Sequence, residues 1–266
     1  MIVAIGSDKG SPGATTLATV LGLVWPSSRV VVELDPRGAD LPFRLMLAGG
    51  QPMATIPSVA ALAVDARSAG APAQLERYAQ PTALGVPVIP GELSSRANGR
   101  ITAHLPAIAT RSAEWGGTAI ADIGGLHPSN PAMVLARAAE AVLLVTRPTV
   151  EGLGHLRDRI DELTEYVGDP RRPGGTVGVV LATEPGNGKS AMEQTGKLLA
   201  SIGSPAAVLG VLAHDPAGAR ALWAGPPTRK LVRSPLVRSG RDLAARIVER
   251  WPALAAGTAP ALAGRS

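Results

Sequence analysis

Short apolar runs alternate with longer segments of helical periodicity along most of the chain. The runs are rich in Val, Ile, Leu and Ala and lack strict apolar–polar alternation, which is typical of strands buried on both faces. They predict seven strands, at residues 2–5, 30–34, 86–89, 118–121, 141–145, 177–181 and 208–212. This alternation of strands and helices predicts an α/β fold, a doubly wound and mostly parallel sheet with helices on both faces.

Helix signals lie between these strands. The apolar spacing predicts helices at 15–24, from 149 to about 167 and at 190–202. Thr149 is the expected N-cap of the second, and Gly203 is expected to end the third. The pair Asn130-Pro131 has the form of an N-cap followed by Pro at the first helical position.

The composition shows no break that would mark a second domain, so residues 1–251 are predicted to form a single domain. Segment 48–83 is rich in Ala, Pro, Gly and Ser and is expected to hold short helices and loops. The segment 252–266 is rich in Ala, Pro and Gly and is expected to be a disordered tail.

The remaining composition excludes several classes of site. The chain has no Cys, which rules out disulfides, Cys-based metal sites and a thiol nucleophile. Its four His are scattered without metal-ligand spacing, and no Gly-x-Ser-x-Gly elbow is present. No apolar run reaches the roughly 18 residues of a membrane helix, and no export signal is evident at the N-terminus. We therefore expect a cytoplasmic protein with an aliphatic core.

Polar residues follow several of the predicted strands directly. The loop 8–16 follows the first strand, Asp35 ends the second, and Asp122 ends a central one. Because ligands of open α/β sheets bind beyond the carboxyl ends of the strands, we expect these residues and the loop after Leu181 to share one edge. A helix N-cap is the simpler interpretation of any single carboxylate, but the set together predicts a ligand site.

The first of these loops has the composition of a phosphate-binding loop. Gly10 and Gly13 let successive N–H groups point inward at an anion, and the helix that starts at Thr15 adds the positive end of its dipole. A Thr hydroxyl there can bind a Mg²⁺ ion held by a phosphate, and Asp122 can hold one of its waters. Asp35 is a candidate to orient an attacking water.

The same string, DKGSPGATT, resembles the deviant Walker A motif of the ParA/MinD family of SIMIBI-class P-loop ATPases. That motif reads Lys-Gly-Gly-x-Gly-Lys-(Thr/Ser)-Thr, and it is matched by Lys9, Gly10, Gly13, Thr15 and Thr16. In the family, the residue matched by Lys9 reaches across a dimer to the nucleotide of the partner.

Other strings extend the resemblance from residue 1 to about residue 250. VVVELDPRGADL is similar to the family's switch I strand, with Glu33 and Asp35 at its two acidic positions, and AIADIGG to its Walker B and switch II segment. AVLLVTRPTVEGL resembles the next strand and turn, and VGVVLATEP and VLGVLAHDPAGARALWAG resemble the last strands around the adenine pocket.

The resemblance implies that the chain binds ATP and Mg²⁺ and acts as a homodimer. It implies Lys9 and Asp35 as catalytic residues and Thr15 and Asp122 as residues around the metal. The nucleotide-binding loop that it implies consists of Gly10, Ser11, Pro12, Gly13, Ala14, Thr15 and Thr16.

Three departures from the family pattern weaken the expected ATPase activity. Ala14 replaces the lysine that contacts the β- and γ-phosphates, and losing such a charge-assisted contact costs about 1.5–3 kcal/mol, or roughly tenfold to a hundredfold in affinity. Pro12 removes one N–H from the anion nest. Ala182 stands where the family often has an Asn that contacts adenine. Hydrolysis should suffer more than binding, because the transferring phosphoryl group needs that cation.

Two lysines are candidates to replace the lost charge. Lys9 could act in its own chain or across a dimer. Lys189 lies in the string TEPGNGKSAMEQTGK, which resembles the end of an ordinary Walker A motif. Thr183 occupies the first glycine position of that string, so residues 186–190 are interpreted as a loop and a helix start instead.

The chain carries a net charge of +5, and basic residues gather near its end. They are Arg229, Lys230, Arg233, Arg238, Arg241, Arg246, Arg250 and Arg265. One interpretation is a solvated helical face, in which Leu243 and Ile247 pack on the sheet. The other is a surface for an anionic partner. The resemblance offers DNA or a membrane, and we favour non-specific contacts to DNA phosphates because the apolar face is small and ends at Pro252.

These observations favour a ParA/MinD-like positioning or partitioning protein that acts as a nucleotide-gated dimer with weak ATP binding. One alternative is a non-catalytic scaffold of the same fold, a pseudo-ATPase that serves a secretion, pilus or cell-division assembly. A second alternative is an active ATPase with a relocated lysine.

Overall fold

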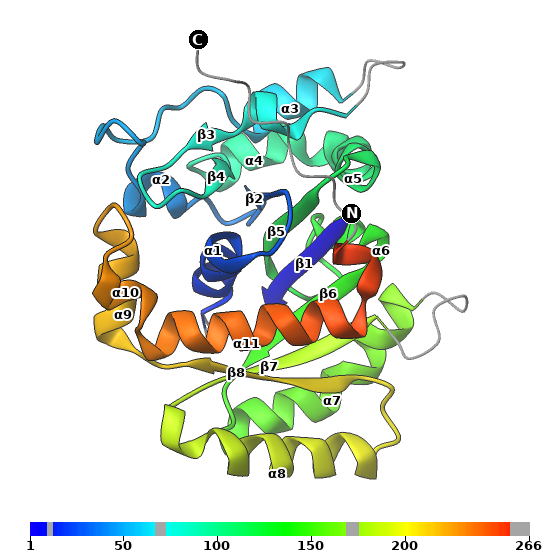
Figure 1. Ribbon diagram of the computed structural model, residues 1–266. Coiled ribbons are helices and arrows are strands. Elements are labelled where there is room, and N and C mark those ends of the chain that lie inside the picture. The colour runs from blue at the N-terminus through cyan, green and yellow to red at the C-terminus, as the bar shows by residue number, and fades with distance from the viewer. Residues whose placement is uncertain (10–12, 67–72, 169–175, 256–266) are drawn as a thin grey trace.

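A sheet of eight strands runs through the middle of the protein, and helices cover both of its faces (Figure 1). Figure 1 shows the computed structural model, in which residues 1–9, 13–66, 73–168 and 176–255 are described. Within these ranges the strand order is β3-β4-β2-β5-β1-β6-β7-β8, and every neighbouring pair is parallel except β3 and β4. The predicted doubly wound, mostly parallel sheet is confirmed.

The predicted strands are all present, and several of them are longer than predicted. The strands are β1 Ile2–Ser7, β2 Arg29–Glu33, β3 Gln80–Pro81, β4 Pro87–Ile89, β5 Thr118–Gly125, β6 Ala141–Thr146, β7 Val177–Thr183 and β8 Ala207–Ala213. The sequence did not predict β3, because its two residues contain no apolar run. It is also the antiparallel edge of the sheet.

The helices include all those that apolar spacing predicted. They are α1 Ala14–Val24, α2 Leu41–Arg44, α3 Val59–Asp65, α4 Ser95–Ile101, α5 Leu105–Glu114, α6 Met133–Ala138, α7 Val150–Val167, α8 Gly188–Ser201, α9 Pro216–Trp223, α10 Arg229–Val232 and α11 Pro235–Arg250, with 3-10 turns η1 Leu75–Tyr78, η2 Thr102–His104, η3 Pro185–Asn187 and η4 Pro252–Ala255. The Thr149 side chain caps α7 by accepting from the N–H of Gly152, as predicted.

The expected helix start at Asn130-Pro131 is wrong by two residues. α6 begins at Met133, because Asn130 uses its side chain to hold the end of β5. Its amide nitrogen donates to the carbonyls of Ile123 and Gly125, and its oxygen accepts from the N–H of Ala132 at 2.8 Å. The residue caps a turn rather than the helix itself.

Part of the expected tail is ordered. Residues 252–255 form η4, and the side chain of Leu254 is buried. The carbonyl of Leu254 accepts from the Thr118 hydroxyl at 3.3 Å, which ties η4 to the start of β5. The expected disorder of residues 256–266 concerns a segment outside the described residues.

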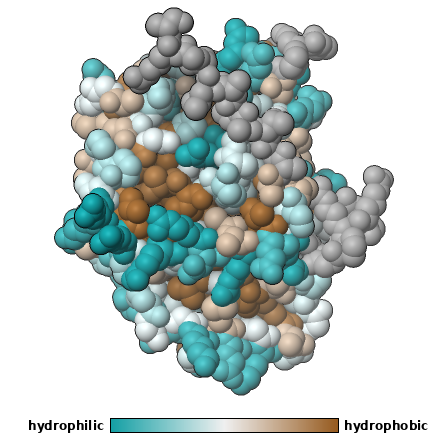
Figure 2. Space-filling view, viewed as in Figure 1, coloured by the Kyte–Doolittle hydropathy of each residue, from teal (hydrophilic) through white to brown (hydrophobic). Residues whose placement is uncertain are grey.

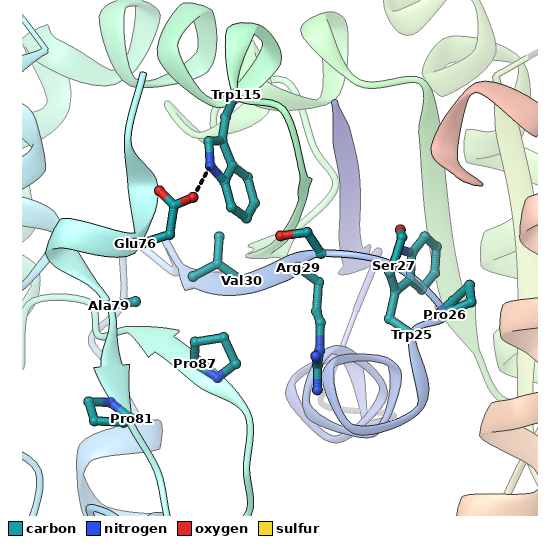
Figure 3. A pocket seen from close by; sticks show the side chains of 11 residues that line it. Trp25, Pro26, Ser27, Arg29, Val30, Glu76, Ala79, Pro81, Pro87 and Trp115 are labelled. Carbon is teal, nitrogen blue, oxygen red and sulfur yellow. Dashed lines mark hydrogen bonds between the residues drawn. The ribbon is translucent and has the colours of Figure 1, made fainter. Parts of the chain in front are cut away.

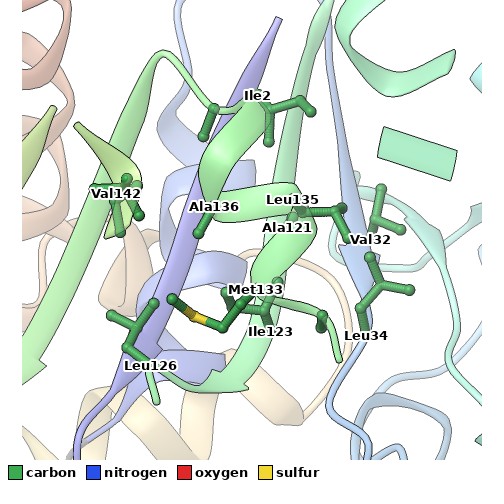
Figure 4. Close-up of a cluster of buried hydrophobic side chains, with 14 of the residues drawn as sticks. Ile2, Val32, Leu34, Ala121, Ile123, Leu126, Met133, Leu135, Ala136 and Val142 are labelled. Atoms are coloured by element: carbon green, nitrogen blue, oxygen red, sulfur yellow. The ribbon is translucent and has the colours of Figure 1, made fainter. Parts of the chain in front are cut away.

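Two aliphatic cores lie on opposite faces of the sheet. One is covered mainly by α3 and α5 to α8, and the other by α1 and α9 to α11. Figure 4 shows part of the first, where Met133 and Leu135 of α6 lie against β1, β5 and β2. Leu243 and Ile247 of α11 are buried in the second core, which confirms that this stripe packs on the sheet.

The helices α1 and α11 approach each other closely at Gly240. A Cβ at this position would lie 2.1 Å from Cγ1 of Val20. Only a residue without a side chain fits such a gap, so Gly240 sets the distance between α11 and the helix that begins at the first loop.

Candidate functional site

The carboxyl ends of the parallel strands bring the predicted site residues to one edge. Glu33 at the end of β2 pairs with Asp122 of β5, and Ile5 of β1 pairs with the same residue from the other side. The N–H of Leu34 donates to the carbonyl of Asp122 at 2.7 Å, so Asp35 follows immediately beside it. This places Asp35, Asp122 and the loop after β1 at one edge.

The helix α1 starts in a way that leaves its N-terminus open to an anion. Gly13 is its N-cap and has φ of 107°, a left-handed conformation that favours glycine. Among the described residues no side chain caps the helix, and no acidic residue lies in its first turn. Thr15 and Thr16 are half-buried there. No carboxylate of α1 itself therefore neutralises the N-terminal partial positive charge of this helix, and the Asp122 carboxylate lies beside its Thr15 hydroxyl.

Ala14 lies inside the protein rather than at the surface of the loop. Its side chain is 8% exposed and belongs to the core between α1 and the sheet. The other predicted loop residues, Gly10, Ser11 and Pro12, lie outside the described residues. In the described part of the loop, α1 therefore begins without a positively charged side chain at position 14.

Asp122 is a carboxylate whose pKa is clearly perturbed at this edge. Burial raises its pKa to about 6, against opposing hydrogen bonds from the Thr15 hydroxyl and from the N–H of Gly124. Its Oδ2 is buried and has no hydrogen-bond partner among the described residues. A buried carboxylate oxygen left unpaired is costly, and a cation or a cation-bound water would satisfy it.

Asp35 is held by an arginine that the sequence reasoning missed. The Arg37 Nη2 donates to Asp35 Oδ2 at 2.7 Å, the Arg37 Nε donates to Oδ1 at 3.0 Å, and the Arg37 N–H donates to Oδ1 at 2.9 Å. The carboxylate lies over Gly124, where an added Cβ would be 2.5 Å from the Asp35 Cγ. Gly124 also has φ of 72°, so glycine is needed there for both reasons.

The signal that could have found Arg37 is a local one. Asp followed by Pro is a common turn start, in which the Asp side chain accepts from the backbone N–H two residues on. In this turn the N–H belongs to Arg37, which brings the start of its side chain back beside Asp35. The guanidinium stays at the surface, with 63% of the side chain exposed.

Glu33 occupies the first acidic position of the segment that contains Asp35. Its side chain supports the chain that follows β2. It is buried, and its Oε1 accepts from the N–H groups of Asp40 at 2.7 Å and Leu41 at 2.9 Å. Its Oε2 accepts from the N–H of Gly91 at 3.4 Å. Burial raises the pKa of Glu33 to about 7, because these N–H groups only partly replace its hydration.

The predicted lysines lie in different places. Lys9 is exposed in the bend after β1, and its neighbour Asp8 is 3.8 Å from Arg159 and 3.9 Å from His155 on α7. Lys189 lies in the first turn of α8 and lines a cavity of about 530 Å³ between α8, β8 and α11. No described contact brings Lys189 to Thr15 or Asp122.

A separate cavity of about 650 Å³ lies at the opposite edge of the sheet, where β2 begins (Figure 3). Trp115 and Glu76 form one side of it, and the indole N–H of Trp115 donates to Glu76 Oε1 at 2.8 Å. Trp25, Pro26 and Ser27 form the other side. None of the predicted site residues lines this cavity.

The basic residues of α10 and α11 are exposed. Figure 2 shows hydrophilic residues gathered along α11 across the middle of this face. Two of them also fix backbone: Arg241 donates to the carbonyl of Val232 at 3.1 Å, and Arg246 to that of Leu209 at 2.9 Å. Arg265 lies outside the described residues. The surface therefore combines charge with local structural contacts.

The described residues hold neither a cluster of metal-ligating side chains nor a membrane-spanning helix. No group of three or more His, Cys, Asp or Glu side chains gathers there as metal ligands. No helix in the described ranges is long and apolar enough to cross a membrane.

Comparison with known proteins gives matches in structure alone. No protein-family model matches the sequence, and no curated protein matches it. The cell-division ATPase MinD of Pyrococcus furiosus is 21% identical with a TM-score of 0.65, over 93% of this chain and 98% of that one. MinD of Pyrococcus horikoshii OT3, complexed with Mg-ADP, is 20% identical with a TM-score of 0.66, over 92% of this chain and 95% of that one.

A DNA-bound protein is among the similar structures. The pNOB8 ParA bound to nonspecific DNA is 16% identical with a TM-score of 0.58, over 94% of this chain and 97% of that one. At these identities the likeness concerns the course of the backbone. The chain has the P-loop α/β fold that MinD and ParA proteins share, over more than nine-tenths of its length.

Proposed function

We propose that this protein binds a nucleoside triphosphate with Mg²⁺ at the edge formed by α1, β2 and β5, and uses the bound state to control a dimer. The observation that carries the proposal is Asp122. Its buried carboxylate lies beside the Thr15 hydroxyl at an uncapped helix N-terminus, and it has an oxygen without a partner among the described residues. An anion at the helix and a hydrated cation at the carboxylate would satisfy both features.

The residues present fit a magnesium ion held together with phosphate. Thr15 would supply a hydroxyl oxygen and Asp122 a carboxylate oxygen to a bound water, which are the hard oxygen ligands that Mg²⁺ prefers. The ion, when bound, would neutralise charge on the phosphates. The solved MinD structure with Mg-ADP supports this ligand class for the fold.

The residues of the site fit a protein that binds a nucleotide but hydrolyses it weakly or not at all. Ala14 is packed in the core and supplies no charge to a transferring phosphoryl group. Asp35 is already engaged by Arg37, so its carboxylate is not free to orient a water in this conformation. The protein would then act mainly through the difference between its nucleotide-bound and free states.

Dimerisation and the cargo follow from the same proposal. Lys9 is exposed beside the site, where it could reach the nucleotide of a second copy. The exposed basic residues of α10 and α11 offer a surface for DNA, as bound by the ParA with the same fold. A nucleotide-gated dimer that positions DNA or another cargo in the cytoplasm combines these features.

The non-catalytic scaffold is the second candidate. The packing of Ala14 and the ion pair at Asp35 favour it over a relocated lysine, because Lys189 lies in another cavity. A scaffold of this kind would dimerise or bind its protein partner without nucleotide.

The test compares two Asp→Asn substitutions by calorimetric titration with Mg-ATP. Asp122→Asn removes the buried carboxylate, whereas Asp161→Asn changes an exposed carboxylate on α7. We expect Asp122→Asn to weaken Mg-ATP binding at least tenfold and Asp161→Asn to leave it unchanged. Equal affinity of the two variants would contradict the assigned role of Asp122, and dimerisation that does not respond to Mg-ATP would favour the scaffold.

A further inference from the structure

We propose that Arg37, in the loop after β2, supplies the positive charge that binds the nucleotide's phosphates. It would take the place of the lysine that position 14 lacks. This inference rests on the proposed nucleotide site and names the residue that makes such a site work without its usual lysine. The ligand class is a nucleoside di- or triphosphate.

Arg37 lies close to the carboxylates of the proposed site. Arg37 is anchored to Asp35 by two side-chain donors and by its own backbone N–H. Asp35 in turn lies over Gly124, two residues beyond Asp122. The charges of Arg37 and Asp122 act on each other, because each shifts the pKa of the other. A guanidinium thus lies beside the carboxylates of this edge.

The side chain of Arg37 is chemically suited to bind phosphate. A guanidinium is planar and always charged, and its fork of donors matches two oxygens of a phosphate as well as those of a carboxylate. Arg37 is already paired with an anion of that geometry, and most of its side chain is exposed. Phosphate oxygens could therefore replace the Asp35 oxygens without a change in the backbone.

Two other arginines in the described chain are paired with different acidic residues. Arg44 pairs with Asp40 and stacks over the Trp223 ring. Arg159, on α7, is held near Asp8. Arg37 is the one that shares contacts with Asp35 and charge interactions with Asp122.

The exchange also has a consequence for Asp35. When the guanidinium turns to phosphate, the Asp35 carboxylate loses its ion pair and becomes free to accept from a water or from a second subunit. Breaking of the Asp35–Arg37 ion pair by phosphate would then change the loop that Glu33 holds in place. Binding and the conformation of this loop become coupled through one side chain.

The experiment measures Mg-ATP and Mg-ADP binding to the full chain by calorimetry. Arg37→Gln is compared with Arg44→Gln, which breaks another Arg–Asp ion pair in the same segment. We expect Arg37→Gln to weaken binding tenfold to a hundredfold and Arg44→Gln to leave it unchanged. Adding Ala14→Lys to the Arg37→Gln chain should restore at least part of the lost affinity, because it returns a cation to the position typical of phosphate-binding loops.

The outcomes separate the inference from the function on which it rests. If the wild-type chain binds Mg-ATP and Arg37→Gln binds equally well, the inference about Arg37 is overturned while the nucleotide site stands. If the wild-type chain does not bind at millimolar Mg-ATP, the proposed function fails and the inference fails with it. Far-ultraviolet circular dichroism and thermal unfolding establish that each variant is folded as the wild type is.

Discussion

The carboxylates of Glu33 and Asp35 have different roles in this protein, although the two residues are only two positions apart. Asp35 is half-buried and pairs with the exposed Arg37, whereas Glu33 is buried and accepts from three backbone N–H groups. Strand alternation would put residues two apart on the same face, but β2 ends at Glu33, so Asp35 lies in the turn that follows and its side chain takes another direction. The hydrogen bonds of Glu33 lie within the chain, so its structural role can be tested without a nucleotide.

Glu33 predicts a dependence of stability on pH. Its pKa is raised to about 7 in the folded chain from an ordinary value of 4.5, so the folded state holds more protons between these values. Stability should therefore fall as pH rises through this window. Relative to Glu33→Gln, the wild type should lose about 1–3 kcal/mol of unfolding free energy between pH 4.5 and pH 8.

Urea unfolding of both chains at the two pH values measures this difference. Glu249→Gln, on the exposed face of α11, serves as the control and should follow the wild type. A difference between wild type and Glu33→Gln that stays constant with pH would show that Glu33 does not carry the effect.

At the scale of elements, the contact between α1 and α11 holds the helix whose N-terminus faces the proposed ligand. Gly240→Ala would place a Cβ 2.1 Å from Val20 Cγ1, so the helices must separate. We expect it to lower the unfolding free energy by about 1–3 kcal/mol. Gly196→Ala in α8 is the matched control, because an added Cβ there meets nothing within 4 Å.

The control should change stability in the opposite direction. Alanine in place of an interior helical glycine stabilises by roughly 0.5–1 kcal/mol when space is open. Denaturant titration gives both values. A Gly240→Ala chain as stable as Gly196→Ala would mean that the two helices are not in the close contact described.

The sequence predicted the sheet well because its strands are continuous aliphatic runs with no competing interpretation. It predicted the edge at which Asp35 and Asp122 meet because parallel topology forces strand ends together. It did not predict β3, which has two residues and no apolar pattern. The start of α6 was placed too early because Asn130 is drawn to carbonyls of β5, a contact that no local pattern encodes.

The sequence predicted which types of residue form the candidate site, but it did not predict that Asp35 pairs with Arg37. Thr15 and Asp122 come together as the motif implied. Arg37 was missed because its role depends on a turn that folds its side chain back on Asp35 and on the glycine beneath that carboxylate. Lys189 was considered because its string contains Gly-Lys-Ser, but the fold places it in a cavity beside β8.

At the scale of the whole molecule, the exposed basic residues of α10 and α11 predict non-specific DNA binding that weakens steeply with salt. Each phosphate contact releases counterions, so the logarithm of affinity should fall linearly with the logarithm of salt concentration. Arg233→Ala with Arg238→Ala should reduce both the affinity and the salt slope, the latter by roughly one to two.

Fluorescence anisotropy with a labelled duplex of arbitrary sequence measures this at several salt concentrations. The pair Arg96→Ala and Arg100→Ala, exposed on α4, serves as a matched control and should leave binding unchanged. Absence of binding at low salt, or binding that does not respond to salt, would remove DNA as the partner of this surface.

The central claim is that the edge formed by α1, β2 and β5 binds a nucleotide although position 14 carries no charge. The most direct measurement is a calorimetric titration of the purified wild-type chain with Mg-ATP. The account predicts saturable binding in the micromolar range, with one nucleotide per chain. No heat of binding up to millimolar Mg-ATP would contradict it, and the protein would then be a scaffold that keeps the fold without the ligand.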